Sequence, residues 1–358
     1  MPEIASPGRV GTPSRRPRIY ALLGSLPRLQ PTRGDQINEA RFMAALSSFA
    51  DVFYNGQLFR PELPGWGLDA TTIEVPAKDY DLYYVRNNTP IFLSCPSPKV
   101  AMAYPFDAEV FRAADALFVT TAAWQWGLEP YSPANPYSRV LTSWYGDMRM
   151  ALPPIINIKQ VLDDRFLVPP EPRDITEARA RMTFGRTIGF FGRIEANTYP
   201  TILTAAYQDL KTRMQSLQLV VAGTLRIPLP DKVLLVPRID YEQMPRFLKA
   251  CIATASDEGD DAEFLGSGKV LDSVAAGVPV IAYKTPPRVE QLGEDYPLYY
   301  RDQAGATQRL KEAALDRDLM ADVKAHLAAR AVMFSPAARS QDLKIAIESL
   351  LEAHARAR

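Results

Sequence analysis

The stretch that decides the fold runs Phe264-Leu265-Gly266-Ser267-Gly268-Lys269-Val270-Leu271-Asp272-Ser273-Val274-Ala275-Ala276-Gly277-Val278-Pro279-Val280-Ile281. Small residues and a lysine open it, and Lys269–Ala276 has the composition of a helix. Gly277 stands where a helix C-cap is expected, and Val278–Tyr283 is typical of a buried strand. Because free backbone N–H groups point outward at a helix start, the loop before Lys269 is suited to bind an anion.

The same alternation extends on both sides of this stretch. Strands are predicted at Thr187–Phe191, Leu217–Ala222, Val233–Val236 and Ile252–Ala255, and helices at Thr201–Met214 and Tyr241–Ala250. Three more helices are predicted at Ala304–Ala314, Arg317–Val332 and Pro336–Arg358. Strands and helices that alternate in this way predict an open parallel sheet.

The first half of the chain shows a weaker version of the pattern. Strands are predicted at Ile19–Leu23, Ala50–Tyr54 and Ala116–Thr120, with short candidates at Ile73–Val75, Leu82–Val85 and Ile91–Leu93. Helices are predicted at Ile37–Phe49 and Glu109–Ala114, and Leu128–Pro154 gives no clear pattern. The fold class is therefore α/β, with two Rossmann-like domains facing across a cleft. We expect a disordered tail over 1–17, an N-terminal domain over 18–168, a C-terminal domain over 169–335 and a C-terminal helix over 336–358.

The composition excludes few functions, but its charge balance, cysteines and apolar stretches indicate where in the cell we expect the protein. The 358 residues include 41 Lys plus Arg and 41 Asp plus Glu, so the global charge does not favour nucleic acid. Cys95 and Cys251 have no metal-ligand spacing and are expected to be buried thiols. With no apolar stretch of about 18 residues and no signal-peptide core, we expect a cytoplasmic protein. The basic run Arg15, Arg16 and Arg18 belongs either to a solvated tail or to a peripheral membrane contact.

Two strand-to-helix loops carry residues suited to a nucleotide. Gly192 and Arg193 follow the strand Thr187–Phe191, where a glycine admits a phosphate to the backbone and an arginine binds it in a bidentate manner. The alternative is a turn glycine beside a surface arginine. Lys269 and Asp272 fall on one helical face, where they could meet a phosphate and the ribose hydroxyls. The alternative there is a solvated ion pair.

The run Asp272–Ala282 resembles the acidic-helix-to-Gly-x-Pro-Val signature of GT-B glycosyltransferases, especially the retaining family 4 type (glycosyl transferases group 1). The segment Ala329–Ser335 is similar to a late segment of that family. The resemblance covers residues 187–340 well and the first half only loosely. It implies two facing domains, with the C-terminal helix crossing back to the first.

The resemblance also implies a donor pocket in the C-terminal domain. Gly192, Arg193, Gly268 and Lys269 would hold the diphosphate of a nucleoside diphosphate sugar, with UDP or GDP favoured, and Asp272 would hold the ribose. The base would lie against backbone near Pro237–Ile239. The resemblance implies neither a cofactor nor a metal, because basic side chains and a helix N-terminus can stabilise the leaving diphosphate.

This chain departs from the family pattern at the acidic pair. The family has two glutamates separated by seven residues, and eight places before Asp272 stands Phe264. Glu263 is adjacent and is the first candidate to contact the sugar hydroxyls, with Asp260 and Asp261 as others. The family lysine that lies five residues after the arginine is replaced by Thr198.

The resemblance places the turn Arg33-Gly34-Asp35-Gln36 at the cleft, so that Gly34 would approach the donor phosphates or the acceptor. Asp35 could act as a general base in an inverting reaction, although an N-capping role is favoured. The chain has two histidines, His326 and His354, both on the last predicted helices. Enzymes of the resembled fold that invert often use a histidine in the N-terminal domain, so the resemblance implies retention here, in which the leaving phosphate takes the acceptor proton.

Three functions stay open at this stage. The first is transfer of a sugar from a nucleoside diphosphate sugar to a hydroxyl acceptor, which could be a saccharide, a lipid-linked molecule or a small molecule. The second is a catalytically weak sugar- or nucleotide-binding partner subunit. A sugar-nucleotide epimerase is less favoured. Six aromatic residues are candidates either for sugar stacking or for core packing: Trp124, Trp126, Tyr131, Tyr137, Trp144 and Tyr145.

Overall fold

The computed structural model describes residues 15–24, 29, 34–61, 72–73, 75–76, 79–103, 107–128, 152–182 and 185–357. The predicted tail up to residue 14, Arg33, most of 128–154, and the aromatic residues Tyr131, Tyr137, Trp144 and Tyr145 lie outside this part. So do the side chains of Asp260 and Asp261.

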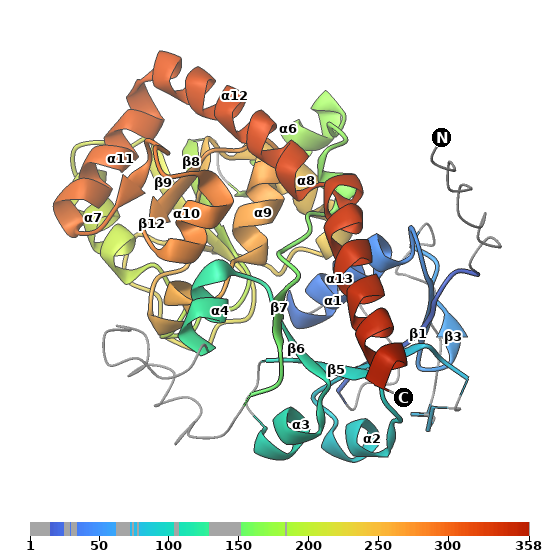
Figure 1. The fold of residues 1–358 in the computed structure, drawn as a ribbon. Coiled ribbons are helices and arrows are strands. Elements are labelled where there is room, and N and C mark those ends of the chain that lie inside the picture. The colour runs from blue at the N-terminus through green and yellow to red at the C-terminus, as the bar shows by residue number, and fades with distance from the viewer. Residues whose placement is uncertain are drawn as a thin grey trace, which may run out of the picture.

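Each half of the described chain builds one sheet (Figure 1). The N-terminal sheet has the strand order β3-β2-β1-β4-β5-β6-β7, and its pairs are parallel apart from the β2–β3 hairpin. Its strands are β1 (Arg18–Leu23), β2 (Asp51–Tyr54), β3 (Gln57–Leu58), β4 (Leu82–Arg86), β5 (Lys99–Met102), β6 (Ala116–Val119) and β7 (Ile155–Asn157). Its helices are α1 (Gly34–Leu46), α2 (Thr89–Ser94), α3 (Ala108–Ala113) and α4 (Ala122–Leu128).

The C-terminal sheet is parallel throughout, in the order β10-β9-β8-β11-β12-β13. Its strands are β8 (Arg186–Phe191), β9 (Leu217–Ala222), β10 (Leu234–Val236), β11 (Ala253–Ala255), β12 (Val280–Tyr283) and β13 (Tyr299–Tyr300). The helices are α6 (Pro172–Met182), α7 (Thr201–Lys211), α8 (Met244–Ala250), α9 (Gly268–Ala275), α10 (Pro286–Leu292), α11 (Gln303–Leu315), α12 (Arg317–Phe334) and α13 (Pro336–Ala357). Three short 3-10 helices lie at Asp164–Phe166, Tyr241–Gln243 and Asp260–Glu263.

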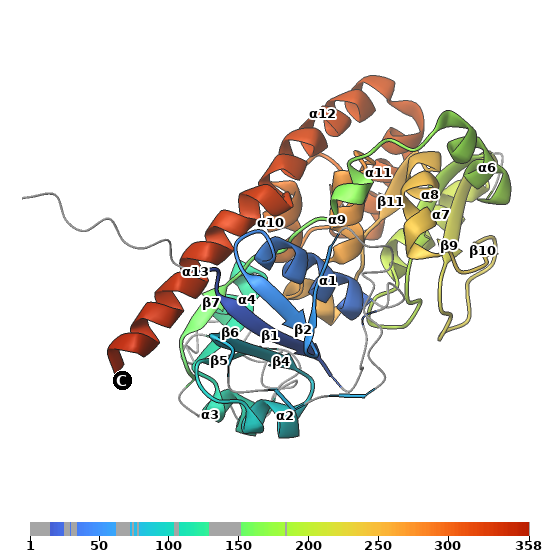
Figure 2. The same cartoon turned by 90° about the vertical axis from the view of Figure 1, so that its right-hand side faces the viewer.

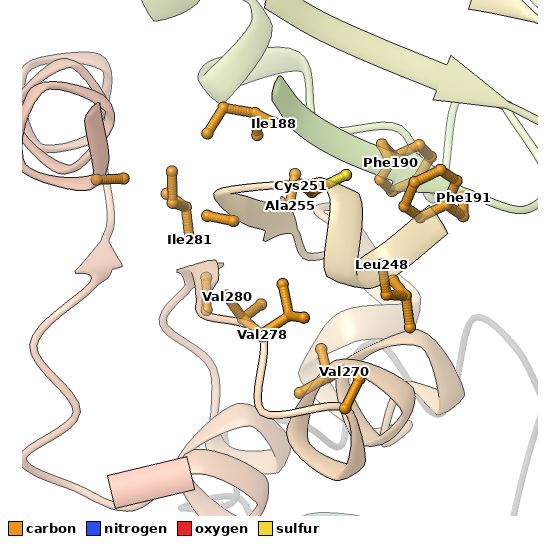
Figure 3. Close-up of a cluster of buried hydrophobic side chains, with 14 of the residues drawn as sticks. Ile188, Phe190, Phe191, Leu248, Cys251, Ala255, Val270, Val278, Val280 and Ile281 are labelled. Atoms are coloured by element: carbon orange, nitrogen blue, oxygen red, sulfur yellow. The ribbon is translucent and has the colours of Figure 1, made fainter. Parts of the chain in front are cut away.

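The C-terminal sheet is held by apolar side chains that leave the strands on both faces. Figure 3 shows Ile188, Phe190 and Ile281 of the strands beside Leu248 of α8 and Val270 of α9. All five are nearly or fully buried. Burial of each such side chain stabilises the fold by about 1.5–3 kcal/mol. This core fixes the position of the strand ends that reach the cleft.

The last helix belongs to the first domain in space. Figure 2 shows α12 and α13 crossing the molecule from the C-terminal sheet to the N-terminal one. Leu343 and Ile347 of α13 are buried in the core of the N-terminal domain, and the Ser340 hydroxyl donates to the Ala45 carbonyl of α1 at 3.0 Å. The crossing that the resemblance implied is therefore present.

Several predicted elements need correction. Ile91–Leu93 was predicted as a strand but lies in helix α2, whose N-cap Asn88 accepts from the Ile91 N–H. Strand β5, strand β7 and helices α4, α6 and α10 were not predicted. Ile73–Val75 lies partly outside the described residues, and its described positions 73 and 75 are not in a strand.

The basic run at the start of the chain is tied to the first domain. Arg15 pairs with Asp81 at 2.8 Å, Arg16 with Asp51 at 3.0 Å and Arg18 with Asp79 at 2.6 Å. From Arg15 onward, therefore, the predicted tail is anchored to the sheet. Both cysteines are free and buried, as expected. Over the described residues, no helix is both long enough and apolar enough to cross a bilayer.

Candidate active site

A cavity of about 850 Å³ lies between the two domains. The N-terminal domain contributes residues from α1 and from the ends of its strands, and the C-terminal domain contributes the loops that follow β8, β9, β10 and β11. This volume is within the range of small-molecule sites, and carboxyl ends of parallel strands are where ligands bind in open α/β sheets. Seven of the eight predicted site residues line it: Gly34, Asp35, Gly192, Arg193, Gly268, Lys269 and Asp272.

Glycines after β8 and β9 let the backbone close tightly at the cavity wall. Gly192 has φ +130°, and a Cβ placed there would lie 2.5 Å from the Lys269 Cε. Gly223 has φ +147°, and its Cβ would collide with the Gly192 carbonyl oxygen. L-residues with a side chain rarely adopt such positive φ values. The glycine that the sequence singled out for phosphate approach thus also leaves room for Lys269.

Lys269 lies in the first turn of α9, where its ammonium pairs with Asp257 and sits 5.0 Å above the Phe190 ring. Asp257 also accepts from the Ser267 hydroxyl at 2.6 Å and lies 3.5 Å from the Arg288 guanidinium. Burial opposes ionisation of Asp257, but the two cations outweigh it and lower its pKa. The lysine that was predicted to bind a phosphate is therefore already paired with a carboxylate of the protein itself.

Asp272 lies one turn further along α9 and meets the other domain. Arg41 of α1 donates to the Asp272 carboxylate and to the Tyr241 hydroxyl, and the Tyr241 hydroxyl donates to Asp163 at 3.0 Å. Burial raises the pKa of Asp272 to about 6, although Arg41 acts in the opposite direction. The predicted ribose carboxylate is thus part of a buried ionic contact between the domains.

Three further arginines, Arg193, Arg226 and Arg238, line the cavity on the side of the C-terminal domain. Arg193 lies 3.3 Å from Glu195 and is 64% exposed, and Arg226 lies 3.8 Å from the same carboxylate. Arg238 and Ile239, in the segment predicted to contact the base, also line the cavity. Thr198, which stands where the resembled family often has a lysine, lines it too and donates to the Arg193 carbonyl at 3.1 Å.

On the N-terminal side, Asp35 lies inside helix α1 rather than before it and is half-buried at the cavity. One turn further, the buried Glu39 accepts from the Tyr84 hydroxyl at 2.9 Å and from Arg86 at 2.7 Å. Burial raises the pKa of Glu39, against the effect of Arg86.

Of the aromatic candidates in the described part of the chain, Trp124 lines the cavity. Trp126 is 43% exposed and does not line it.

Glu263 is the predicted site residue that does not line the cavity. The next residue, Phe264, is fully buried in the core of the N-terminal domain, and its carbonyl accepts from the Thr121 hydroxyl at 2.5 Å. Because Phe264 anchors the loop in this way, Glu263 is held in the short 3-10 helix before it. The geometry gives no support to the predicted contact of Glu263 with sugar hydroxyls. Asp257, two residues after the end of β11, is the carboxylate that this loop brings to the cavity.

Four important side chains were not predicted from the sequence: Arg41, Asp257, Arg288 and Arg226. Asp257 carried a usable signal, because it follows a buried strand.

Neither histidine lines the cavity. His326 contacts the Leu292 carbonyl at 2.6 Å, and His354 lies near the end of α13. Within the described part of the chain, no three His, Cys, Asp or Glu side chains are grouped so that they could hold a metal ion.

Two facing Rossmann-like domains, a cavity between them and a last helix that crosses back define the GT-B fold, the architecture of a large class of glycosyltransferases. The chain is similar to Alr3699/HepE from Anabaena in complex with UDP-glucose, with a TM-score of 0.63, 14% identity and coverage of 92% of this chain and 99% of that one. It is also similar to α,α-trehalose 6-phosphate synthase from Burkholderia multivorans, with a TM-score of 0.61, 10% identity and coverage of 96% and 98%.

A third similar structure is a point mutant of O-GlcNAc transferase from Thermobaculum terrenum, with a TM-score of 0.57, 13% identity and coverage of 98% and 70%. No protein-family model matches the chain, and no curated protein matches its sequence. At these identities the structures establish the fold. The retaining family 4 assignment remains a prediction.

Proposed function

We propose that the protein is a glycosyltransferase that moves a sugar from a nucleoside diphosphate sugar to a hydroxyl acceptor. The observation that carries this proposal is the convergence of Gly192, Arg193, Gly268 and Lys269 on one cavity between two domains. These residues come from neighbouring loops at one edge of a parallel sheet, the arrangement that binds diphosphates. The UDP and UDP-glucose complexes of the Anabaena protein favour UDP as the nucleotide.

In this proposal the diphosphate lies at the start of α9, between Lys269 and Arg193. The ribose hydroxyls donate to Asp272, and the base lies against the backbone near Ile239. On binding, the Lys269 ammonium would leave the Asp257 carboxylate and pair with the phosphate. Arg288 would stay beside Asp257 and neutralise its charge. The charge of the leaving diphosphate is thereby met by groups that are already oriented.

The transfer breaks the bond between the anomeric carbon and the phosphate oxygen and forms a bond from that carbon to the acceptor oxygen. We propose retention, with the acceptor proton passing to the leaving phosphate, and with cationic side chains serving where other enzymes use a metal. Asp35 is the candidate base for the inverting alternative, since it lines the cavity on the opposite domain. The acceptor, the cytoplasmic location and a peripheral membrane contact remain predictions.

One observation favours the second candidate function, a catalytically weak nucleotide- or sugar-binding subunit. Glu263 lies outside the cavity lining, and both carboxylates on the donor side, Asp257 and Asp272, are neutralised by the protein's own cations. Release of free UDP from UDP-glucose without an acceptor separates the two functions. An enzyme should show slow release, whereas a binding subunit should show stabilisation by UDP-glucose and no release.

The donor site is tested by Lys269→Ala with Lys284→Ala as a matched control. Both lysines pair with a carboxylate and lie about 5 Å above an aromatic ring, with Lys284 on Glu294 at 2.6 Å and 5.3 Å from Tyr299. Lys284 does not line the cavity. We expect Lys269→Ala to abolish the rise in Tm that UDP produces, because a charge-assisted contact is lost. Lys284→Ala should keep that rise, and an equal rise in both variants would remove the pocket assignment.

A further inference from the structure

Arg41 brings a positive charge from the N-terminal domain to the start of α9. Its side chain is 3% exposed, and its guanidinium donates to Asp272 and Tyr241 of the C-terminal domain. A Cβ added at Gly268, the first residue of α9, would lie 3.5 Å from the Arg41 Nη1. The guanidinium is therefore next to the helix end at which the donor diphosphate is proposed to bind.

Arg41 is not fully satisfied by the contacts that it makes. Its Nε is buried and has no hydrogen-bond partner, and Arg41 lines the cavity. A buried donor without a partner is uncommon in folded proteins, because the desolvated N–H lacks the hydrogen bond that it makes in water. The protein's own contacts therefore leave one donor of Arg41 without an acceptor.

The charged side chains around the cavity indicate whether the ligand is an anion or a cation. Among the residues that the structure describes, eight cationic side chains line the cavity: Arg41, Arg86, Lys159, Arg193, Arg226, Arg238, Lys269 and Arg288. Four described carboxylates line it: Asp35, Glu39, Asp257 and Asp272. The difference of four positive charges favours an anionic ligand, and a guanidinium binds phosphate oxygens through two parallel N–H groups.

We propose that Arg41 is a ligand for the diphosphate of the donor, contributed by the N-terminal domain and held by Asp272 while no nucleotide is bound. The inference rests on the proposed function. When the ribose hydroxyls occupy Asp272, the Arg41 guanidinium transfers its hydrogen bonds to phosphate oxygens at the start of α9. One side chain then couples nucleotide binding to the contact between the two domains.

The experiment uses three ligands that differ only in phosphate: uridine, UMP and UDP. Their dissociation constants are measured by calorimetry for the wild-type chain, Arg41→Gln and Arg41→Lys. Arg339→Gln is the matched control, since Arg339 is also a buried arginine with an unpartnered Nε and an aspartate partner, Asp342 at 3.2 Å, but lies outside the cavity lining.

We expect Arg41→Gln to weaken UDP binding by about ten- to a hundredfold, because hydrogen bonds to a charged group are lost. Uridine binding should stay equal or become tighter, because Asp272 is freed for the ribose. Arg41→Lys keeps the charge without the planar fork and should fall between wild type and Arg41→Gln for UDP. Arg339→Gln should leave the ratio of UDP to uridine affinity unchanged.

A purely structural role for Arg41 would weaken uridine and UDP by the same factor, and that result overturns the inference, as does an unchanged UDP affinity. If Arg41→Gln does not fold, the Arg41→Lys comparison decides by the same criterion. Wild-type protein that binds none of the three ligands would contradict the proposed function with UDP as its nucleotide. A failure of the inference alone appears as normal wild-type binding with an unchanged affinity ratio.

Discussion

Asp257 and Asp272 show how the surroundings of a residue set its chemistry. Both are aspartates on or beside the start of α9, and both line the cavity. Asp257 faces two cations and a hydroxyl, so its pKa is lowered despite burial. Asp272 faces Arg41 but also the carboxylate of Asp163, and burial dominates, so its pKa is raised to about 6. The same residue type therefore favours ionisation at one position and opposes it at the other.

The raised pKa of Asp272 predicts a pH-dependent stability. In the unfolded chain the carboxyl loses its proton near its ordinary value of 3.8, but in the folded chain only near 6. Between these values the folded state holds the extra proton, so the contribution of Asp272 to the unfolding free energy falls as pH rises from about 4 to 6. We expect urea unfolding of wild type and Asp272→Asn to show a difference that changes by about 2 to 3 kcal/mol over this window. A constant difference would contradict the assignment.

At the scale of elements, helix α13 is the clearest case of a segment whose role differs from its place in the sequence. It follows the C-terminal domain along the chain, but Leu343 and Ile347 are buried in the core of the N-terminal domain. The helix thereby completes that core beside α1. The N-terminal domain is consequently built from two parts of the chain.

A pair of substitutions on α13 tests this role. Leu343→Ala removes a fully buried side chain and should lower the unfolding free energy by about 2–5 kcal/mol. Ile345→Ala, two residues away, removes a side chain that is 55% exposed and should change it by about 0.5 kcal/mol or less. Chemical denaturation of the two variants provides the measurement. Equal losses would show that α13 does not pack as described.

At the scale of the whole molecule, a set of contacts holds the two domains together around the cavity. Phe264 of the C-terminal domain is buried in the N-terminal core, the Ala122 N–H donates to Glu290 at 2.8 Å, and Gln291 donates to Gln160 at 2.6 Å. Gln160 lines the cavity, which residues of both domains form, so the shape of the proposed donor site depends on the relative position of the domains.

Phe264→Ala should weaken this coupling. We expect a loss of about 3–5 kcal/mol in unfolding free energy, because a buried aromatic ring is removed. Phe92→Ala is the control, since Phe92 is equally buried in the same core but belongs to the N-terminal domain itself. UDP affinity should fall in Phe264→Ala and not in Phe92→Ala. An unchanged UDP affinity in both variants would separate the donor site from the domain contact.

The sequence predicted strands β8 and β9 of the C-terminal domain because they are continuous apolar runs followed by glycine, Gly192 and Gly223. Gly192, Lys269 and Asp272 were placed at one cavity on this basis, and the structure brings them together. The partners of these residues could not be predicted in the same way. Arg41 and Asp272 are 231 residues apart, and no local pattern marks such a pair.

The first half was harder to predict because its elements are short. Ile91–Leu93 has the composition of a strand, but Asn88 before it and Pro90 at the helix start are the stronger signals and set helix α2. The position of Glu263 outside the cavity lining has a similar origin. Spacing along the chain suggested a carboxylate at the sugar, whereas the burial of Phe264 decides where that loop can go.

The position of α13 has a consequence for how the protein is made. A ribosome synthesises the N-terminal sheet first, and domains commonly fold in the order in which they emerge. Here the second domain has its core from one continuous stretch and can finish folding while the first still lacks Leu343 and Ile347. We therefore expect the half that is translated first to complete its core last, once α13 has been made.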